Sequence, residues 1–519
     1  MKARCVCGWG GWVLSLAVVG GALALAGSAA GEDVIDVGNR KQLFVDETFI
    51  EHSENIALTM NPPRQTGEVL LDADQPHEEG GYVSLYSSVL KGADGIIRLW
   101  YDLITPYGPD PYDHHRRVCY AESEDGLHFT KPELGLHEVD GSTANNVVLP
   151  GVIGGCSVWL DPKAPPEHRF KTQAKSYHPT RFPMHSSPDG RHWQLFAEPA
   201  LSGPTDTQTI IFWDPAFERY VMYTREWVRS DTERYRAVRR LESDDLQQWD
   251  SESVVFDPDE TDRATYDTPD ISPPVDYYGA TVFKYPLAEH DEAAAPDDRV
   301  YIMLAQAFWH FTDKGYDGVI GPFVRDVRLA VSRDGKTFHR AGGRNPFLRP
   351  GPAGSFDSKG VWALPHPIQM GDELWIYYVG TNQDRTSRPM DSRIDPEAPD
   401  GDRLGGISRA VMRLDGFVSA DAPYDGGEFV TPLIRFAGGR LELNVDTGGG
   451  GSVLVELLDS AGDPIEGFTI EDAIPVNGNS VRMPVQWGGD GDVGQLAGTP
   501  VRLRFVMRDC KLYAFQFCE

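Results

Sequence analysis

Basic residues are scarce in this sequence. Its 519 residues include 48 Lys and Arg against 78 Asp and Glu, and the formal net charge is −30. Such an excess of negative charge repels phosphate backbones, so we expect no general binding to nucleic acid. The remaining composition, 40% hydrophobic and 11% aromatic, is that of a globular protein whose length allows two or three domains.

Long apolar runs are missing except at the N-terminus. There, Lys2 and Arg4 precede an apolar run over residues 12–26, and Ser28-Ala29-Ala30 supplies small residues for cleavage. The run is too short for a membrane anchor, and no stop-transfer pattern follows it. We therefore predict a signal peptide over residues 1–30, a secreted or periplasmic protein, and no contact with the membrane after cleavage.

Cysteine is also scarce. Cys5 and Cys7 lie in the predicted signal peptide, and the others are Cys119, Cys156, Cys510 and Cys518. Four cysteines allow three pairings, which the sequence does not decide, and isolated buried thiols are an equal alternative. Because the spacings match no zinc pattern, we predict no metal ligands and no cofactor, with a structural calcium ion as the one option left open.

Helical periodicity is absent as well, and turn residues are abundant. The sequence contains 54 Gly and 38 Pro, and from Gly81 onward short runs of β-branched and aromatic residues alternate with turns. One motif recurs among these runs: a strand leads into Ser-x-Asp-Gly, and an aromatic residue follows three positions after the glycine. Complete or altered copies cover residues 123–129, 187–193, 243–249, 332–338 and 413–417.

The recurring motif predicts a repeated unit of β-sheet. Asp and Gly form a tight hairpin turn in which Gly takes a positive φ. Two strand-like runs precede each copy, which gives a four-stranded unit that cannot bury its apolar face alone. We predict an all-β chain with a five-bladed β-propeller over 77–420, an N-terminal segment over 31–76 that packs on the propeller, and a C-terminal β-sandwich over 421–519.

The recurring motif followed by a β-sandwich resembles the secreted five-bladed propeller glycoside hydrolases, namely the levanase/invertase-like and arabinanase-like families. The resemblance covers roughly residues 43–519. It implies a glycosidase that acts on a polysaccharide or oligosaccharide in a carboxylate-lined central channel. The Asn-Asp-Pro-Asn and Glu-Cys motifs of the levanase-like enzymes are absent, and Trp159-Leu-Asp161-Pro only partly resembles their Arg-Asp-Pro motif. The resemblance therefore implies the fold and not particular catalytic residues.

Acidic residues near the starts of the inner strands are the catalytic candidates. The first strand of each blade lines the channel, and glycoside cleavage needs an acid and a second carboxylate. Asp206 and Asp357 lead directly into apolar inner strands and are the preferred pair. Glu79, Asp267 and Glu226 are the other candidates, whereas Asp161, Asp214 and the aspartates of the recurring motif are expected to be structural.

Basic and aromatic residues supply the substrate-binding candidates. Arg225 and Arg236 belong to an arginine-rich run in blade three and would grip an anionic sugar by a bidentate contact, unless they form a solvated strand pair. His77, Tyr82 and Gln208 complete the predicted set.

Three functions fit these patterns. A hydrolase requires two facing carboxylates, about 5–5.5 Å apart if retaining and about 6.5–9.5 Å if inverting. A non-catalytic glycan-binding propeller requires a channel lined by aromatics and amides. A lyase or an anionic-sugar enzyme requires Arg225 or Arg236 in the channel with a Tyr or His across from it. Export and the number of carboxylates favour the hydrolase.

Overall fold

The computed structural model describes most of the chain after the predicted signal peptide. The described residues are 33–106, 114–151, 156–173, 182–199, 201, 207–229, 234–250, 253–264, 275–287, 299–310, 323–382, 405–489 and 491–519. The predicted signal peptide and the candidates Asp206 and Asp267 lie outside these ranges. Within them, no helix is long and apolar enough to cross a bilayer.

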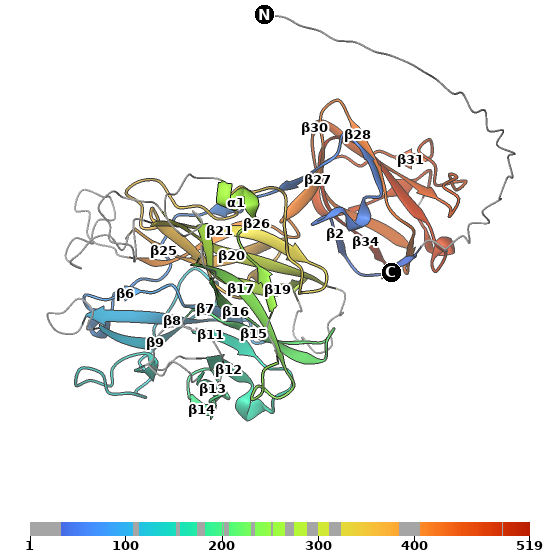
Figure 1. The fold of residues 1–519 in the computed structure, drawn as a ribbon. Helices are drawn as coiled ribbons and strands as arrows, with labels where there is room; N and C mark the ends of the chain where they lie inside the picture. Colours follow the sequence, from blue (N-terminus) through green and yellow to red (C-terminus); the bar gives the residue numbers. More distant parts are fainter. Residues whose placement is uncertain are drawn as a thin grey trace, which may run out of the picture.

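Five antiparallel blades follow one another along the chain, as predicted (Figure 1). Blade one contains β6 (Tyr82–Val83), β7 (Ser88–Lys91), β8 (Ile97–Pro106), β9 (His114–Ser123) and β10 (Val147–Pro150). Blade two contains β11 (Ser157–Leu160), β12 (Phe170–Gln173), β13 (Met184–Ser187) and β14 (Gln194–Ala197). Blade three contains β15 (Ile210–Asp214), β16 (Arg219–Arg229), β17 (Arg234–Ser243) and β18 (Ser253–Phe256).

The last two blades are joined by a single parallel contact between β21 and β23. Blade four contains β19 (Val275–Tyr285), β20 (Val300–His310), β21 (Phe323–Ser332) and β22 (His339–Arg340), and the short helix α1 (Glu260–Ala264) precedes it. Blade five contains β23 (Gly360–Ala363), β24 (Ile368–Met370), β25 (Glu373–Thr381), β26 (Gly406–Arg413) and β5 (Arg64–Gln65). Because β5 comes from near the N-terminus, it closes the ring.

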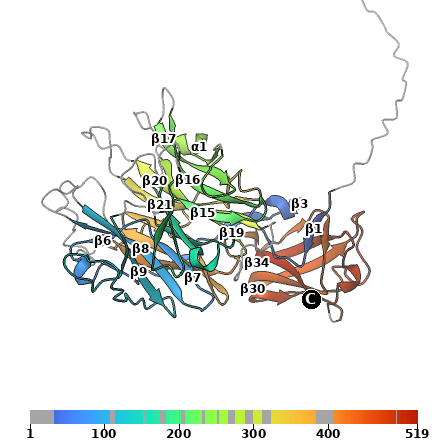
Figure 2. The same cartoon turned by 90° about the horizontal axis from the view of Figure 1, so that it is seen from below.

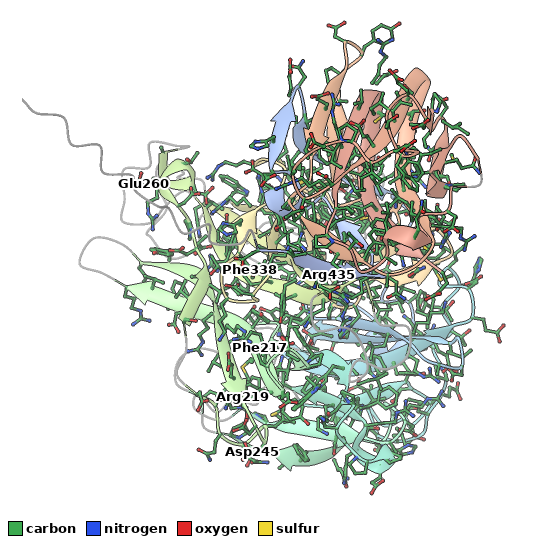
Figure 3. The ribbon with its side chains drawn as sticks, turned by 90° about the vertical axis from the view of Figure 1, so that its right-hand side faces the viewer. Phe217, Arg219, Asp245, Glu260, Phe338 and Arg435 are labelled. Atoms are coloured by element: carbon green, nitrogen blue, oxygen red, sulfur yellow. The ribbon has the colours of Figure 1, made fainter. Side chains whose placement is uncertain are left out.

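The recurring motif holds its own turn and also ties neighbouring blades together. In the second copy, Ser187 Oγ accepts from Gly190 N at 2.9 Å, and Asp189 Oδ1 accepts from the next two amides. Gly190 has a φ of +75°, and its carbonyl accepts from Trp100 Nε1 of blade one at 2.6 Å. Tyr377 and Tyr223 make the equivalent bond to the motif glycines of blades one and four. The motif aspartates are structural, and Asp245 lies at the outer edge of the molecule (Figure 3).

Buried ion pairs repeat the same inter-blade pattern. Asp161 accepts from Tyr220 of blade three at 3.1 Å and pairs with Lys171 at 2.9 Å. Asp214 accepts from Tyr301 of blade four at 2.5 Å and pairs with Lys284 at 2.9 Å. Both aspartates are therefore structural, as the sequence predicts.

The N-terminal segment packs on the propeller as predicted, through Leu43, Val45, Met60 and β5, but most of its strands also belong to the sheets of the C-terminal domain. β1 (Ile35–Gly38), β2 (Gln42–Leu43), β3 (His52–Glu54) and β4 (Ala57–Met60) pair with β29 (Ile434–Phe436), β34 (Arg502–Cys518), β28 (Gly427–Val430) and β27 (Val418–Ala422), respectively. Figure 2 shows β1 and β3 among the orange and red strands of this domain. The predicted boundary at residue 420 falls inside β27, because that strand continues the C-terminal sheet.

The C-terminal domain is a β-sandwich made largely by one bent strand pair. β30 (Arg440–Leu458) and β34 pair along their length, and the register shifts between Thr447 and Ser452. A Cβ on Gly448 or Gly451 would lie 1.9 or 2.3 Å from Asp509 atoms, so only glycine permits this close bend. Apolar residues from both halves of β30 share one core. The remaining strands are β31 (Ala473–Ile474), β32 (Asn479–Pro484) and β33 (Gln486–Trp487). The four cysteines outside the predicted signal peptide are free thiols.

His366 links blade five to blade two and should make stability depend on pH. Its Nε2 lies 3.0 Å from Val158 O, and burial lowers the pKa of His366 from 6.5 to about 4. Folding thus favours the neutral ring, so the contribution of His366 is full above about pH 6.5 and is lost as pH falls toward 4. That loss should reach about 2–3 kcal/mol of unfolding free energy.

The variant His366→Asn tests this expectation, because Asn tolerates the positive φ of 64° at this position and does not titrate in this range. Urea unfolding at several pH values should give a shallower acid slope for the variant than for the wild type. Burial also lowers the pKa values of His77 and His185. Because both residues are present in the wild type and in the variant, their contributions to the acid slope cancel in the comparison. Identical slopes would assign the pH dependence to other groups.

Candidate active site

Polar side chains cross the propeller axis and join the inner strands. Gln208 Nε2 donates to Ser87 O of blade one at 2.9 Å, and Gln208 Oε1 accepts from Trp362 Nε1 of blade five at 2.7 Å. Thr207 Oγ1 donates to Tyr278 O of blade four at 3.1 Å. Groups from four blades, two of them backbone carbonyls, can meet in this way only near the common axis of the blades. Gln208 is 1% exposed and therefore holds these strands together as a buried link.

A chain of aromatic rings lies beside these contacts. The rings of Tyr86 and Tyr278 meet that of Trp362 edge-on, with centroids 5.7 and 5.4 Å away. Phe308 stacks on Tyr278 at 5.7 Å, and the hydroxyls of Tyr86 and Tyr278 are 3.5 Å apart. Burial and the neighbouring Tyr278 raise the pKa of Tyr86 despite the opposing effect of Arg225 and Arg116. Tyr86 is therefore a hydrogen-bond donor at neutral pH.

Three guanidinium groups surround the rings. The Arg225 group lies 5.1 Å from the Tyr278 centroid, and the Arg236 group lies 4.5 Å from the same ring and 4.4 Å from Phe308. The Arg116 group lies 6.0 Å from the Tyr86 ring. Burial lowers the pKa of Arg116, but Asp102, Tyr86 and Tyr82 outweigh it and raise this pKa. The Arg116 side chain is consequently charged.

Asp276 connects Arg236 to a histidine. Arg236 Nε donates to Asp276 Oδ2 at 2.7 Å, and His310 Nε2 lies 3.3 Å from Asp276 Oδ1 and 3.3 Å from an Arg236 amine. Burial would raise the pKa of Asp276, but Arg236 and His310 outweigh burial and hold this pKa below its ordinary value. Asp276 is therefore ionised although it is only 3% exposed.

Asp102 brings a second carboxylate from blade one. It is 1% exposed and lies 3.5 Å from Arg116 Nη1. A chain of contacts joins Asp102 to Asp276. It runs from Arg116 to the rings of Tyr86 and Tyr278, and from Tyr278 to Arg236, which pairs with Asp276. We refer to this set as the axial cluster; its members are Tyr86, Asp102, Arg116, Arg225, Arg236, Asp276, Tyr278, Phe308, His310 and Trp362.

The structure brings four of the predicted site residues to this place. Arg225 and Arg236 belong to the axial cluster, with tyrosines and His310 across from them. Gln208 accepts a hydrogen bond from Trp362 of the cluster, and Tyr82 lies close enough to Arg116 to affect its pKa.

Three predicted catalytic residues have contacts elsewhere. Asp357 accepts from Ser355 Oγ at 2.7 Å and from Tyr378 OH at 3.0 Å, contacts typical of a structural carboxylate. Glu226 pairs with Arg239 at 2.9 Å on the face of β16 opposite Arg225, because neighbouring strand residues point to opposite faces. Glu79 is exposed at the end of a short 3-10 helix (Pro76–Glu78). No described contact joins these residues to the axial cluster.

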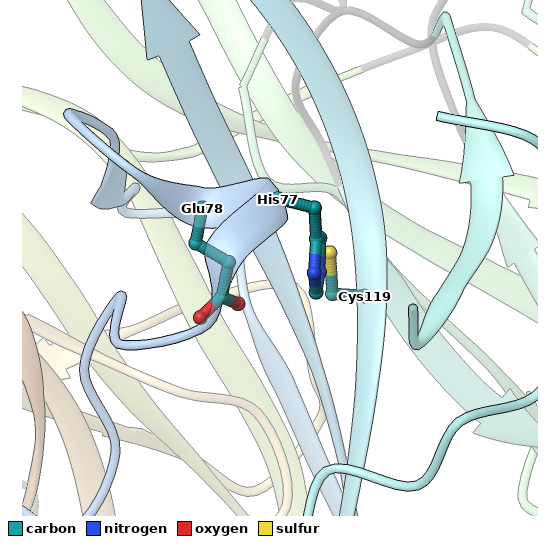
Figure 4. Close-up of side chains that lie close together, drawn as sticks. All are labelled: His77, Glu78 and Cys119. Atoms are coloured by element: carbon teal, nitrogen blue, oxygen red, sulfur yellow. The ribbon is translucent and has the colours of Figure 1, made fainter. Parts of the chain in front are cut away.

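His77 lies in blade one, on the same short helix. Its Nε2 is 2.8 Å from Asn146 Oδ1, and burial lowers its pKa. Figure 4 shows His77 near Glu78 and Cys119, which is the one described trio whose atoms lie close enough for a metal ion. Lys131 Nζ already lies 2.6 Å from Glu78, and burial raises the pKa of the Cys119 thiol. Both effects disfavour a bound cation, so these residues do not fit a metal site.

Asp276 and Tyr278 are the main residues that sequence reasoning missed. The inner strand of blade four, β19, begins at Val275, so Asp276 lies at its start. An acid at the start of an inner strand was the right criterion, so the correct strand boundary would have identified Asp276. Asp102, Arg116 and His310 lie on second and third strands, where no comparable signal exists.

Comparisons with known proteins give similar folds only. No protein-family model and no curated protein matches the sequence. A β-1,2-mannobiose phosphorylase from Listeria innocua is 14% identical with a TM-score of 0.44, covering 69% of this chain and 98% of that one. A glycosyl hydrolase from Bacteroides ovatus is 13% identical with a TM-score of 0.41, covering 68% and 94%. An α-L-arabinofuranosidase from Fusarium graminearum is 13% identical with a TM-score of 0.35, covering 70% and 99%. The five blades are established by the strand pairing of this chain itself, and the activity has to be argued from its own residues.

Proposed function

We propose that the protein is a carbohydrate-active enzyme that hydrolyses a glycosidic bond at the axial cluster. One observation carries the proposal: two buried carboxylates, Asp102 of blade one and Asp276 of blade four, each contact an arginine that lies near the same chain of aromatic rings. Glycoside hydrolysis uses two carboxyl groups on either side of the scissile bond. Aromatic rings and a few fixed polar groups are also typical of small-molecule sites.

The surroundings of the two carboxylates suggest different roles. Arg236 and His310 keep Asp276 ionised, which suits a group that stabilises positive charge on the sugar or activates water. His310 is the more exposed partner, with 32% of its side chain accessible, and can exchange a proton with substrate. Asp102 supplies the second carboxylate that the reaction requires.

A lyase is the second candidate, favoured by the pairing of His310 with Asp276. Elimination from a uronate needs a base that removes a ring proton, and a carboxylate-paired histidine can serve as one. The raised pKa of Tyr86 argues against tyrosinate as that base. Hydrolysis is therefore the better supported reaction.

The reaction class is tested by incubating wild type and Asp102→Asn with a panel of polysaccharides in ¹⁸O-labelled water. Hydrolysis places one label in the products for each bond cleaved, and Asp102→Asn should lose most of the turnover. Unlabelled products with an ultraviolet-absorbing double bond would instead identify a lyase. If the protein binds a polysaccharide but releases no product, it is a non-catalytic glycan-binding propeller.

We also propose that the enzyme acts outside the cytoplasm. The support is the N-terminal sequence, in which a basic start, an apolar run and Ser28-Ala29-Ala30 precede Gly31.

A further inference from the structure

The axial cluster carries an excess of positive charge within a strongly acidic chain. The full sequence has a formal net charge of −30, yet the cluster contains three arginines and two aspartates. Burying a guanidinium without full compensation costs free energy. Two arginines outside the cluster each have two carboxylate partners: Arg340 contacts Asp259 and Asp262, and Arg504 contacts Glu428 and Glu456. Arg116 differs from these two arginines, because its ion pair with Asp102 is long.

Arg116 is the clearest case. Its ion pair with Asp102 is long, at 3.5 Å, and its side chain is 16% exposed. Its Nε is fully buried and makes no hydrogen bond to any residue that the structure describes. A guanidinium carries five N–H donors in a planar fork, and buried donors without acceptors are costly. One donor of Arg116 thus lacks an acceptor in the described part of the chain, and the side chain keeps a partly exposed portion that can meet a ligand.

Arg236 is oriented in a complementary way. Asp276 and His310 take its Nε and one terminal amine, and the rings of Tyr278 and Phe308 fix its plane. A guanidinium fixed along one edge keeps its remaining edge for a planar or tetrahedral oxyanion. The hydroxyls of Tyr86 and Tyr278 lie between Arg116 and Arg236 in the chain of contacts.

We propose that the axial cluster binds a sugar bearing an anionic group, and that Arg116 and Arg236 bind its oxygens. The group is a uronate carboxylate or a sulfate ester, since both offer oxygens that accept from a guanidinium fork. This inference rests on the proposed function, because it names the substrate class of the same site. A neutral sugar would leave the positive charge of Arg116 poorly compensated.

Two matched pairs of ligands test the inference by titration calorimetry at low temperature. Oligogalacturonate is compared with its methyl ester, which keeps sugar and linkage but removes the charge. Sulfated dextran oligosaccharide is compared with plain dextran oligosaccharide. The anionic member of at least one pair should bind about tenfold more tightly or better. The pair that shows the difference identifies carboxylate or sulfate as the group bound.

Variants assign the effect to the site. Arg116→Ala should reduce the preference to about twofold or less, and Arg116→Lys should retain part of it, because Lys keeps the charge and loses the fork. Arg98→Ala is the control: Arg98 lies on the neighbouring strand β8 of the same blade but pairs with the exposed Asp94, and the variant should keep the full preference. Unfolding temperatures verify that each variant is folded.

The inference is overturned if neither anionic ligand is preferred, if no ligand binds, or if Arg116→Ala keeps the tenfold preference. Its failure is distinguishable from that of the proposed function. Charge-selective binding without hydrolysis would remove the hydrolase and leave this inference standing. Hydrolysis of neutral glycans alone would support the proposed hydrolase and remove the inference of an anionic substrate.

Discussion

Lys284→Met should lower the free energy of unfolding by about 3–5 kcal/mol. Lys284 pairs with Asp214 at 2.9 Å, and both side chains are at most 1% exposed. Removing the ammonium leaves the Asp214 carboxylate in the seam between blades three and four with Tyr301 as its remaining side-chain partner. A buried charge that loses its counter-ion retains its desolvation cost without the compensating attraction. Urea unfolding of the two proteins measures the difference.

Two controls isolate the buried charge. Lys336→Met removes a lysine that is 49% exposed and lies 3.3 Å from Glu242, and it should cost about 0–1 kcal/mol. The double variant Lys284→Met with Asp214→Asn should regain much of the lost stability, since Asn still accepts from Tyr301 and carries no charge. Equal effects of the two lysine variants would show that the blade seam does not depend on this ion pair.

Most of the propeller could be predicted from local patterns. The turn of the recurring motif is a property of a few adjacent residues, so the sequence displays it directly. The third copy shows how far the pattern extends: Leu246 replaces the glycine and still takes a φ of +64°. Pairing over long sequence distances carries no such signal. The two residues of β5 pair with Ala410 and Val411, and nothing local in Arg64-Gln65 indicates that partner.

The candidate site was predictable where strand periodicity sufficed. Arg225 and Arg236 were predicted, and their shared face follows from pairing across β16 and β17. The same periodicity places Glu226 on the opposite face, so a stricter use of it would have excluded Glu226 as a partner of Arg225. The meeting of Asp102, Asp276 and His310 depends on how blades one and four are placed around the axis. That placement is a property of the closed ring and not of any one strand.

Asp276→Asn should lower turnover by about 10²–10⁴-fold while leaving the protein folded. The asparagine fills the same space and still accepts a hydrogen bond, but it removes the negative charge that faces both Arg236 and His310. The loss is expected for hydrolysis and for elimination, because either reaction uses the charge of Asp276 or the histidine that it orients. Initial rates on the substrate found in the polysaccharide panel measure the effect.

Asp245→Asn supplies the matched control for this substitution. Asp245 is a carboxylate of the recurring motif, it binds the amides of its own turn at 2.8 Å, and it lies at the outer edge of blade three (Figure 3). The same chemical change there should leave turnover within about twofold of the wild type, because an exposed charge far from the axis is screened by solvent. If Asp276→Asn also retained turnover to within tenfold, the buried carboxylate of blade four would be a structural partner of Arg236, and the reaction would have to use carboxylates other than the pair proposed here.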